Sequence, residues 1–454
     1  MSALLNLNWR WGKAGWLLAV VLLIFASGAW AGPASAGAGD NRNSTLSPAN
    51  NPAPWLPSGP LTVEQALQRA LDSDAQIASL KAALEIARQQ RLAATDIKDP
   101  VLQAQSRSSH ASESVSSGEL DNSRLGVGVY VPNPWLMVPG VDARTADYQA
   151  AQADLSNATW QVNCDVRRLF AQLDYLTNDL AFTVDRLRLN GEVLNALQAR
   201  VGQGAATVSD LMTASRQYVQ SQDDFDQINH QYQLARRQLA SLLDIPPDSF
   251  ELATNPAEVP SLPEPDLSLQ QAEMMATNSR CDLAALRWRA EAAESTYHEI
   301  WNEKLPWIKE VQAGYEDNSG NASDKYWVGL AVDIPIFSWT KNHADDVALA
   351  KAALASVDLT NGIRLIRIDL RDAMDELDEA RRQQARDDTS ISPLIITMRQ
   401  TLATLKNTPN IMPEQVAAAE LQLVETLRLE LETRWQYQLA LFNLERIIGA
   451  PLSQ

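Results

Sequence analysis

Two short stretches carry the strongest structural signal in this sequence: residues 125–132 read LGVGVYVP, and residues 328–335 read VGLAVDIP. In both, a large apolar side chain occupies every second position, which places these side chains on one face of an extended strand. The opposite face carries residues such as Gly126, Gly128 and Asp333. A less regular strand is expected before each stretch, at about 101–108 and 307–316. The pattern therefore predicts two hairpins, residues 101–131 and residues 307–334.

The rest of the chain repeats at nearly the same spacing. Residues 232–235 and 437–440 both read YQLA, and residues 61–66, LTVEQA, return as residues 267–272, LSLQQA. Matches at nearly equal offsets, 205 and 206 residues, indicate two copies of a single structural unit of about 205 residues. The copies are expected at residues 61–243 and 267–451. The proline-rich residues 244–266 are expected to connect them.

Each copy is expected to contain a helix, the hairpin, a long helix and a return helix. The first helices are predicted at residues 61–97 and 267–303, the long helices at 140–200 and 342–405, and the return helices at 209–243 and 413–449. A helix of about 60 residues is near 90 Å long, which is wider than a globular core. The first return helix has coiled-coil spacing, and Pro393 is expected to kink or break the second long helix.

The first residues look like a targeting segment. Arg10 and Lys13 precede an apolar run at residues 16–26, and the small residues Ala29 and Ala31 follow on either side of Trp30. This pattern predicts a secretory signal peptide over residues 1–31, because the run is shorter than a membrane-spanning helix needs. Residues 32–60 are rich in Asn, Ser, Pro and Gly and are expected to form a flexible N-terminal extension.

Charge and composition exclude several classes of function. A formal net charge of -18 has the wrong sign for binding nucleic acid. Cys164 and Cys281 are too few for a zinc ribbon or a disulfide framework, although an exported protein could pair them. The histidines are dispersed, and neither a dinucleotide-binding loop nor a nucleophile elbow occurs. We therefore expect no enzyme, no cofactor and no metal site.

Four strands of eight to ten residues have the length of outer-membrane strands, yet closing a barrel takes at least about eight. An oligomer could supply the missing strands and hide the sheet edges from lipid. Aromatic residues at both ends of the strands are expected to lie at the membrane interfaces. They are Trp135, Trp307 and Trp339 at the end near the helices, and Tyr326 and Trp327 at the other end. The alternative is that they cap a soluble sheet.

The duplicated order of helix, hairpin, long helix and return helix resembles the TolC-type outer membrane efflux protein family. Two further features resemble the same family: the strand before each long helix, and the Leu-rich ends at residues 239–243 and 444–449. The resemblance covers about residues 60–451. It implies a mainly α fold with a small β part: long antiparallel coiled-coil helices form a periplasmic α-barrel, and four strands per chain contribute to a 12-stranded outer-membrane β-barrel of a homotrimer.

The same resemblance implies a passive exit duct that works with a periplasmic adaptor protein and an inner-membrane transporter. The helix tips would dock the adaptor, through residues Gly202, Gly204, Ser209, Asn410 and Pro413. Prolines in the second tip, where the family favours a glycine-containing turn, leave the docking mode open. Asp210 and Glu414 become candidates for the channel entrance. The alternative is that both are first-turn acids placed favourably at a helix N-terminus.

Three functions remain open on the sequence. The first is the outer membrane channel of a tripartite efflux system, and the second is a type I protein secretion channel. The third is an envelope coiled-coil protein that transports nothing and whose hairpins pack on another protein.

Overall fold

The computed structural model describes residues 59–107, 122–252, 267–318, 325–336, 343–408 and 411–452. The chain divides into two compact units, residues 1–55 and 56–454, and the first lies outside the described residues. The expected signal peptide, most of the expected connector, Trp339 and Asn410 also lie outside them.

Each expected first helix is in fact a pair of helices. Helices α2 (Val63–Ser73) and α3 (Ala75–Ala93) are separated by Asp74, whose backbone is extended. The Asp74 carboxylate accepts a hydrogen bond from the Ile77 amide, so this residue ends one helix and caps the next. In the second half, Arg280 separates α6 (Leu269–Ser279) from α7 (Cys281–Asn302) without a side-chain cap.

The first long helix, α4 (Pro134–Gly202), has 69 residues and is about 100 Å long. Asn133 caps its first turn, and Pro134 occupies a position where a missing amide costs nothing. Pro139 lies inside the helix and leaves the carbonyl of Trp135 without its usual helical donor. The side-chain amide of Asn302 donates to that carbonyl at 2.6 Å, so the helix continues through the proline.

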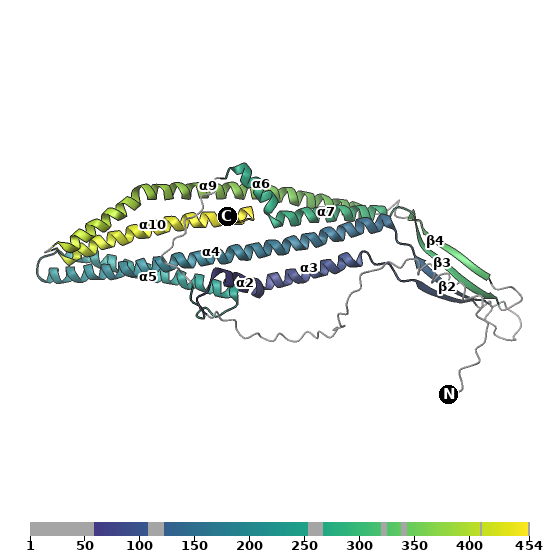
Figure 1. Cartoon of the computed structure of the whole chain (residues 1–454), viewed down its shortest axis with the longest axis horizontal. Coiled ribbons are helices and arrows are strands. Elements are labelled where there is room, and N and C mark those ends of the chain that lie inside the picture. The colour runs from purple at the N-terminus through teal and green to yellow at the C-terminus, as the bar shows by residue number, and fades with distance from the viewer. Residues whose placement is uncertain are drawn as a thin grey trace, which may run out of the picture. The chain divides into compact units, whose positions relative to one another are not determined.

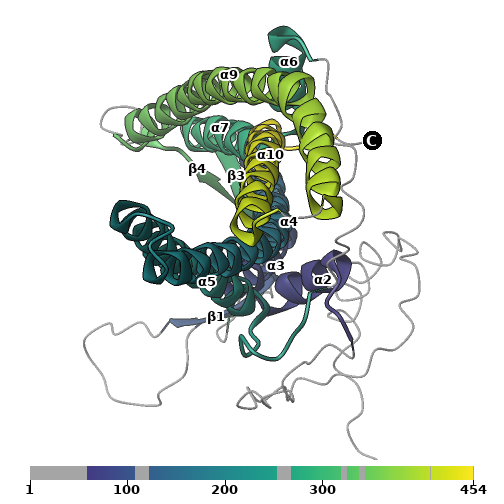
Figure 2. The same ribbon diagram turned by 90° about the vertical axis from the view of Figure 1, so that its left-hand side faces the viewer.

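Helix α4 packs against helices from both halves of the chain. It contacts α5 (Val208–Leu243) and α3 from its own half, and α7 and α10 (Pro413–Ile448) from the other. Figure 2 shows these helices around it in an end-on view. Small buried residues on α4, among them Ala143, Ala146 and Ala150, allow this close approach.

The second long helix, α9 (Ala344–Asn407), continues through Pro393, so of the expected kink or break the break is absent. The helix changes direction along its length, as Figure 1 shows. It packs against α7 and α10. No helix in the described ranges is both long enough and apolar enough to cross a membrane.

The four strands form one antiparallel sheet in the order β1-β2-β3-β4. The strands are β1 (Val101–Arg107), β2 (Asn122–Tyr130), β3 (Trp307–Asn318) and β4 (Lys325–Asp333). Besides the two hairpins, β2 pairs with β3, and Gly126 lies opposite Gly314. The hairpins of the two halves are therefore joined into a single sheet, as the ribbon in Figure 1 shows.

Candidate functional site

The sheet has one face on which large apolar side chains are exposed. Ala313 of β3 pairs with Val127 of β2 on one side and with Val328 of β4 on the other, so these three side chains share one face. On this face Val328 is 77% exposed and Leu330 is 63% exposed. The same face includes further exposed apolar residues, namely Leu102, Leu125, Val127, Val129, Val311 and Val332. A contiguous exposed apolar surface of this kind is typical of contact with lipid or with another protein.

The opposite face of the sheet is polar. The side-chain amide of Gln103 donates to the Glu310 carboxylate at 3.3 Å. Arg124 forms an ion pair with Glu316 at 3.1 Å. Because successive side chains of a strand alternate between faces, these groups lie on the side away from Val328. The sheet therefore separates an apolar surface from a polar one.

The expected interface aromatics do not all lie on the apolar face. Tyr326 does, and its ring lies 5.7 Å from the ring of Tyr315. The structure places Trp327 on the polar face instead, against Gly126, Gly314 and Gly329. Trp327 and Tyr326 therefore lie on opposite faces of the sheet.

The other two described aromatics lie where the sheet meets the helices. The ring N–H of Trp307 donates to the Val131 carbonyl at 3.2 Å, which ties the start of β3 to the end of β2. Trp135 is exposed in the first turn of α4. By strand register Trp307, which pairs with Asp333, lies on the polar face like Trp327, and the interface role of these residues stays a prediction.

Ion pairs link α4 to α10 along much of their shared length. The buried Asp179 carboxylate accepts hydrogen bonds from Arg428 at 2.5 and 3.3 Å. Arg167 pairs with the buried Glu445 at 3.2 Å. The Asp179 contact raises the pKa of Arg428, although burial of the guanidinium opposes this. These pairs join residues of the two halves.

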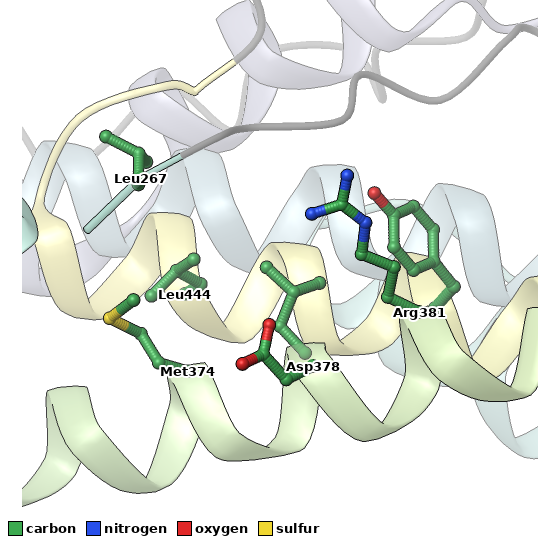
Figure 3. A pocket seen from close by; sticks show the side chains of 7 residues that line it. Leu267, Met374, Asp378, Arg381 and Leu444 are labelled. Carbon is green, nitrogen blue, oxygen red and sulfur yellow. The ribbon is translucent and has the colours of Figure 1, made fainter. Parts of the chain in front are cut away.

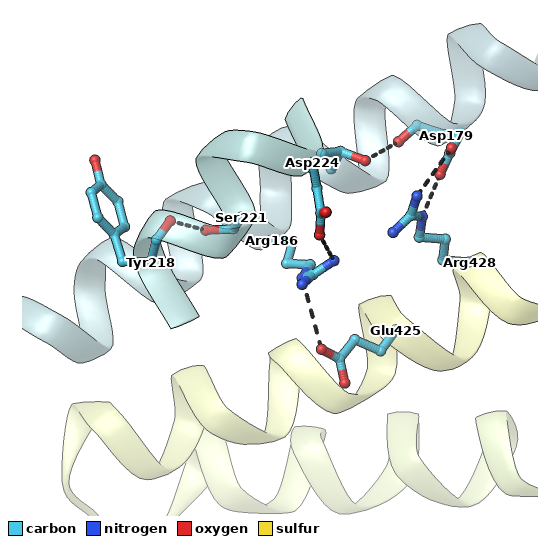
Figure 4. A network of polar contacts seen from close by, with 8 residues as sticks. Asp179, Arg186, Tyr218, Ser221, Asp224, Glu425 and Arg428 are labelled. Atoms are coloured by element: carbon cyan, nitrogen blue, oxygen red, sulfur yellow. Dashed lines mark hydrogen bonds and ion pairs between the residues drawn. The ribbon is translucent and has the colours of Figure 1, made fainter. Parts of the chain in front are cut away.

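Arg186 connects three helices. It pairs with Asp224 of α5 at 2.7 Å and with Glu425 of α10 at 3.8 Å. Figure 4 shows the guanidinium between the two carboxylates, with the Asp179–Arg428 pair nearby. The return helices of both halves are thus held to α4 by one side chain.

At the tips, the structure places the two candidate entrance acids differently. Asp210 belongs to a capping box with Thr207, and hydrogen bonds from Thr207 lower the pKa of its carboxyl group. Glu414 pairs with Arg200, whose Nη2 also donates to the Ala205 carbonyl at 2.9 Å. Sequence reasoning missed Arg200 because its partner Glu414 is on another helix.

The expected tip residues are at helix ends. Gly204 has a φ of +71°, which favours glycine, whereas a side chain on Gly202 would meet no atom within 4 Å. Ser209 lies in the first turn of α5, and Pro413 begins α10.

A cavity of about 240 Å³ opens between α9 and α10. Figure 3 shows Leu267, Met374 and Leu444 near one another, with Asp378 and Arg381 along α9. Its lining combines aliphatic side chains with the polar groups of Asp378, Arg381 and Tyr437. Within the described ranges, no group of three His, Cys, Asp or Glu side chains could hold a metal ion. Cys164 and Cys281 are both free thiols.

Comparison with known proteins agrees with this architecture. Residues 66–244 match the model of the family described as outer membrane efflux protein. No curated protein matches the chain by sequence.

Solved structures with the same fold span nearly the whole chain. A membrane protein from Pseudomonas aeruginosa has a TM-score of 0.67 at 18% identity, covering 88% of this chain and 97% of that one. VceC, an outer membrane protein of Vibrio cholerae, has a TM-score of 0.64 at 18% identity, covering 86% and 97%. The outer-membrane channel OprN has a TM-score of 0.65 at 14% identity, covering 86% and 91%. Residues 66–244 thus resemble the outer membrane efflux protein family in sequence, and the described chain has the fold of these solved outer-membrane proteins.

Proposed function

We propose that the protein is the outer membrane channel of a tripartite efflux system, a passive duct formed by three copies of the chain. The observation that carries this proposal is the two-faced sheet. Exposing Val328 and Leu330 to water would be unfavourable, whereas exposing them to hydrocarbon is not. The polar face with Gln103 and Glu310 would then line the lumen.

The order of the strands supports oligomerisation. Strands β1 and β4 are the edges of the described sheet, and each has one side without a partner among the described strands. Unpaired backbone groups are very costly in lipid, so a sheet that enters the membrane must close on itself. Four strands are too few to close, but three copies would supply twelve.

The helices support the same arrangement. Helix α9 has exposed apolar side chains along its length, including Val347, Leu354, Val357, Leu365 and Ile368. Helix α5 has Met212 and Val219 exposed. Neighbouring copies packed side by side would cover these residues. The long helices would then extend the duct from the outer membrane into the periplasm.

The partners follow from the family and from the tips. A periplasmic adaptor would dock at the tips, which include Gly202, Gly204, Ser209 and Pro413, and an inner-membrane transporter would deliver the cargo. Asp210 and Glu414 remain the candidate entrance residues. The Arg200 ion pair offsets the charge of Glu414, so Asp210 would contribute most of the negative charge at an entrance.

Fractionation and cross-linking test the proposal. Mature protein should be found in the outer membrane, should cross-link to a trimer and should conduct ions in a planar bilayer. Protein that stays in the soluble periplasm, or that forms no closed trimer, would contradict it and would favour an envelope coiled-coil protein.

Deletion of the gene distinguishes efflux from secretion. Increased sensitivity to metals, dyes or antibiotics supports efflux. Unchanged sensitivity together with lost export of a protein would favour the type I secretion channel instead.

A further inference from the structure

Trp327 rests on a patch of bare backbone made by three glycines on three neighbouring strands. We call Gly126 of β2, Gly314 of β3 and Gly329 of β4 the glycine seat. A Cβ atom on Gly126 would lie 2.8 Å from Cζ2 of the Trp327 ring. One on Gly314 would lie 2.6 Å from the ring nitrogen, and one on Gly329 would lie 3.3 Å from Cζ3. The indole therefore contacts all three strands at once.

The glycine seat lies on the polar face of the sheet. Gly126 pairs with Gly314, and Gly314 pairs with Trp327, so all three residues point the same way. The neighbouring pair, Tyr315 with Tyr326, points to the apolar face. In the proposed trimer the ring would therefore project from the lumen wall.

The glycines determine how far the ring projects. Contacts below about 3 Å to a Cβ atom do not occur in folded proteins, so a side chain at position 126 or 314 would force the ring away from the strands. With glycine at these positions the indole can lie against the backbone. The ring then occupies the space directly over the glycine seat. In the proposed trimer, the part of the lumen farther from the strands stays free of it.

We propose that Trp327 and the glycine seat set the width of the lumen within the sheet, by holding this large aromatic side chain of the described polar wall against the backbone. This inference rests on the proposed function, because it requires the polar face to line a duct. Lifting the ring from its seat would narrow the passage and restrict bulky cargo.

The substitution Gly126→Ala tests this most cleanly. Its new methyl group meets the Trp327 ring at 2.8 Å and the Ala313 carbonyl oxygen at 3.3 Å. Gly314→Ala is less suitable, because its methyl group would also meet the Leu125 carbonyl oxygen at 2.5 Å. A change in conductance would then combine displacement of the ring with displacement of the neighbouring backbone. Reconstituted G126A channels should show a loss of conductance. When polyethylene glycols are added at the end of the channel formed by the sheet, the size above which they are excluded should be smaller for G126A than for the wild type.

The double variant G126A/W327A provides the decisive comparison. Without the indole the added methyl group has no ring to displace and keeps only its 3.3 Å contact with the Ala313 carbonyl oxygen, so conductance and polymer cut-off should return to at least the wild-type value. Two controls are matched to it. Gly128→Ala is on the same strand but meets the Glu310 carboxylate, so W327A should not rescue it. Tyr326→Ala, on the opposite face, should not rescue G126A.

The outcomes separate this inference from the proposed function. If wild-type protein conducts and G126A behaves like it, or if W327A fails to rescue G126A, the inference is wrong and the channel proposal stands. If wild-type protein does not conduct, the channel proposal itself fails. If G126A inserts poorly, recovery of insertion in the double variant supports displacement of the ring, and continued failure contradicts it.

Discussion

The carboxylate of Asp179 on α4 and the guanidinium of Arg428 on α10 form a two-point hydrogen-bonded ion pair between the halves of the chain. The Asp179 side chain is 1% exposed and that of Arg428 is 28% exposed. A buried carboxylate without a cation is strongly unfavourable, so this pair helps to fix the register of the two helices.

Removing the cation should destabilise the protein more than removing an exposed ion pair. For Arg428→Ala, which leaves the Asp179 charge buried, we expect a loss of about 3 kcal/mol. Glu192→Ala, which breaks the exposed pair with Arg188, should cost no more than about 0.5 kcal/mol. Thermal unfolding in detergent measures both, and equal effects would show that the buried pair has no special role.

The Asn302 amide should be needed for the start of α4. Asn302→Ala leaves the Trp135 carbonyl without a donor, because Pro139 has no amide hydrogen. We expect faster hydrogen exchange in the first turns of α4, measured by mass spectrometry. Asn443→Ala, which removes an exposed side-chain contact with Glu376, is a suitable control and should leave this region unchanged.

Cys164 should react slowly with thiol reagents. Burial raises the pKa of its thiol to about 11, so little thiolate is present at pH 8. In a C281S variant, alkylation by iodoacetamide should be slow at pH 8 and should accelerate as the pH rises toward the thiol pKa. Denaturant should abolish the protection, and rapid alkylation of folded protein at pH 8 would contradict the assigned burial.

Arg200 should order the first tip. Arg200→Ala removes the pair with Glu414 and the hydrogen bond to Ala205. Hydrogen exchange should therefore increase at residues 203–206 and at the start of α10. Arg188→Ala, on the same helix, should not produce this change. No increase at the tip would show that the Thr207 capping box suffices to order it.

The strands and the long helices could be predicted because their signals are local. Alternation at residues 125–131 indicates a strand wherever its partner lies. Asn133 followed by Pro134 is a helix-start signal, but the predicted long helix began only at residue 140, after Pro139. Only the contact with Asn302, more than 160 residues away, explains why the helix accommodates this proline.

The unpredicted parts of the site depend on tertiary contacts. The pairing of β2 with β3 joins two hairpins separated by nearly 200 residues. The alternation of side chains along the strand places Trp327 and Val328 on opposite faces of the sheet. The position of Trp327 at the end of the strand nevertheless favoured a role at the membrane interface. The glycines that receive its ring come from three strands, so no single stretch of sequence shows them together.

The central claim is that the apolar face of the sheet contacts lipid while its polar face lines a duct. Fluorescent labels at V328C and Q312C, each in a C164S/C281S background and reconstituted in vesicles, test it directly. The label at position 328 should be quenched by a lipid-soluble nitroxide and not by iodide, and the label at position 312 should show the reverse. Iodide quenching at position 328 equal to that at position 312 would contradict the claim.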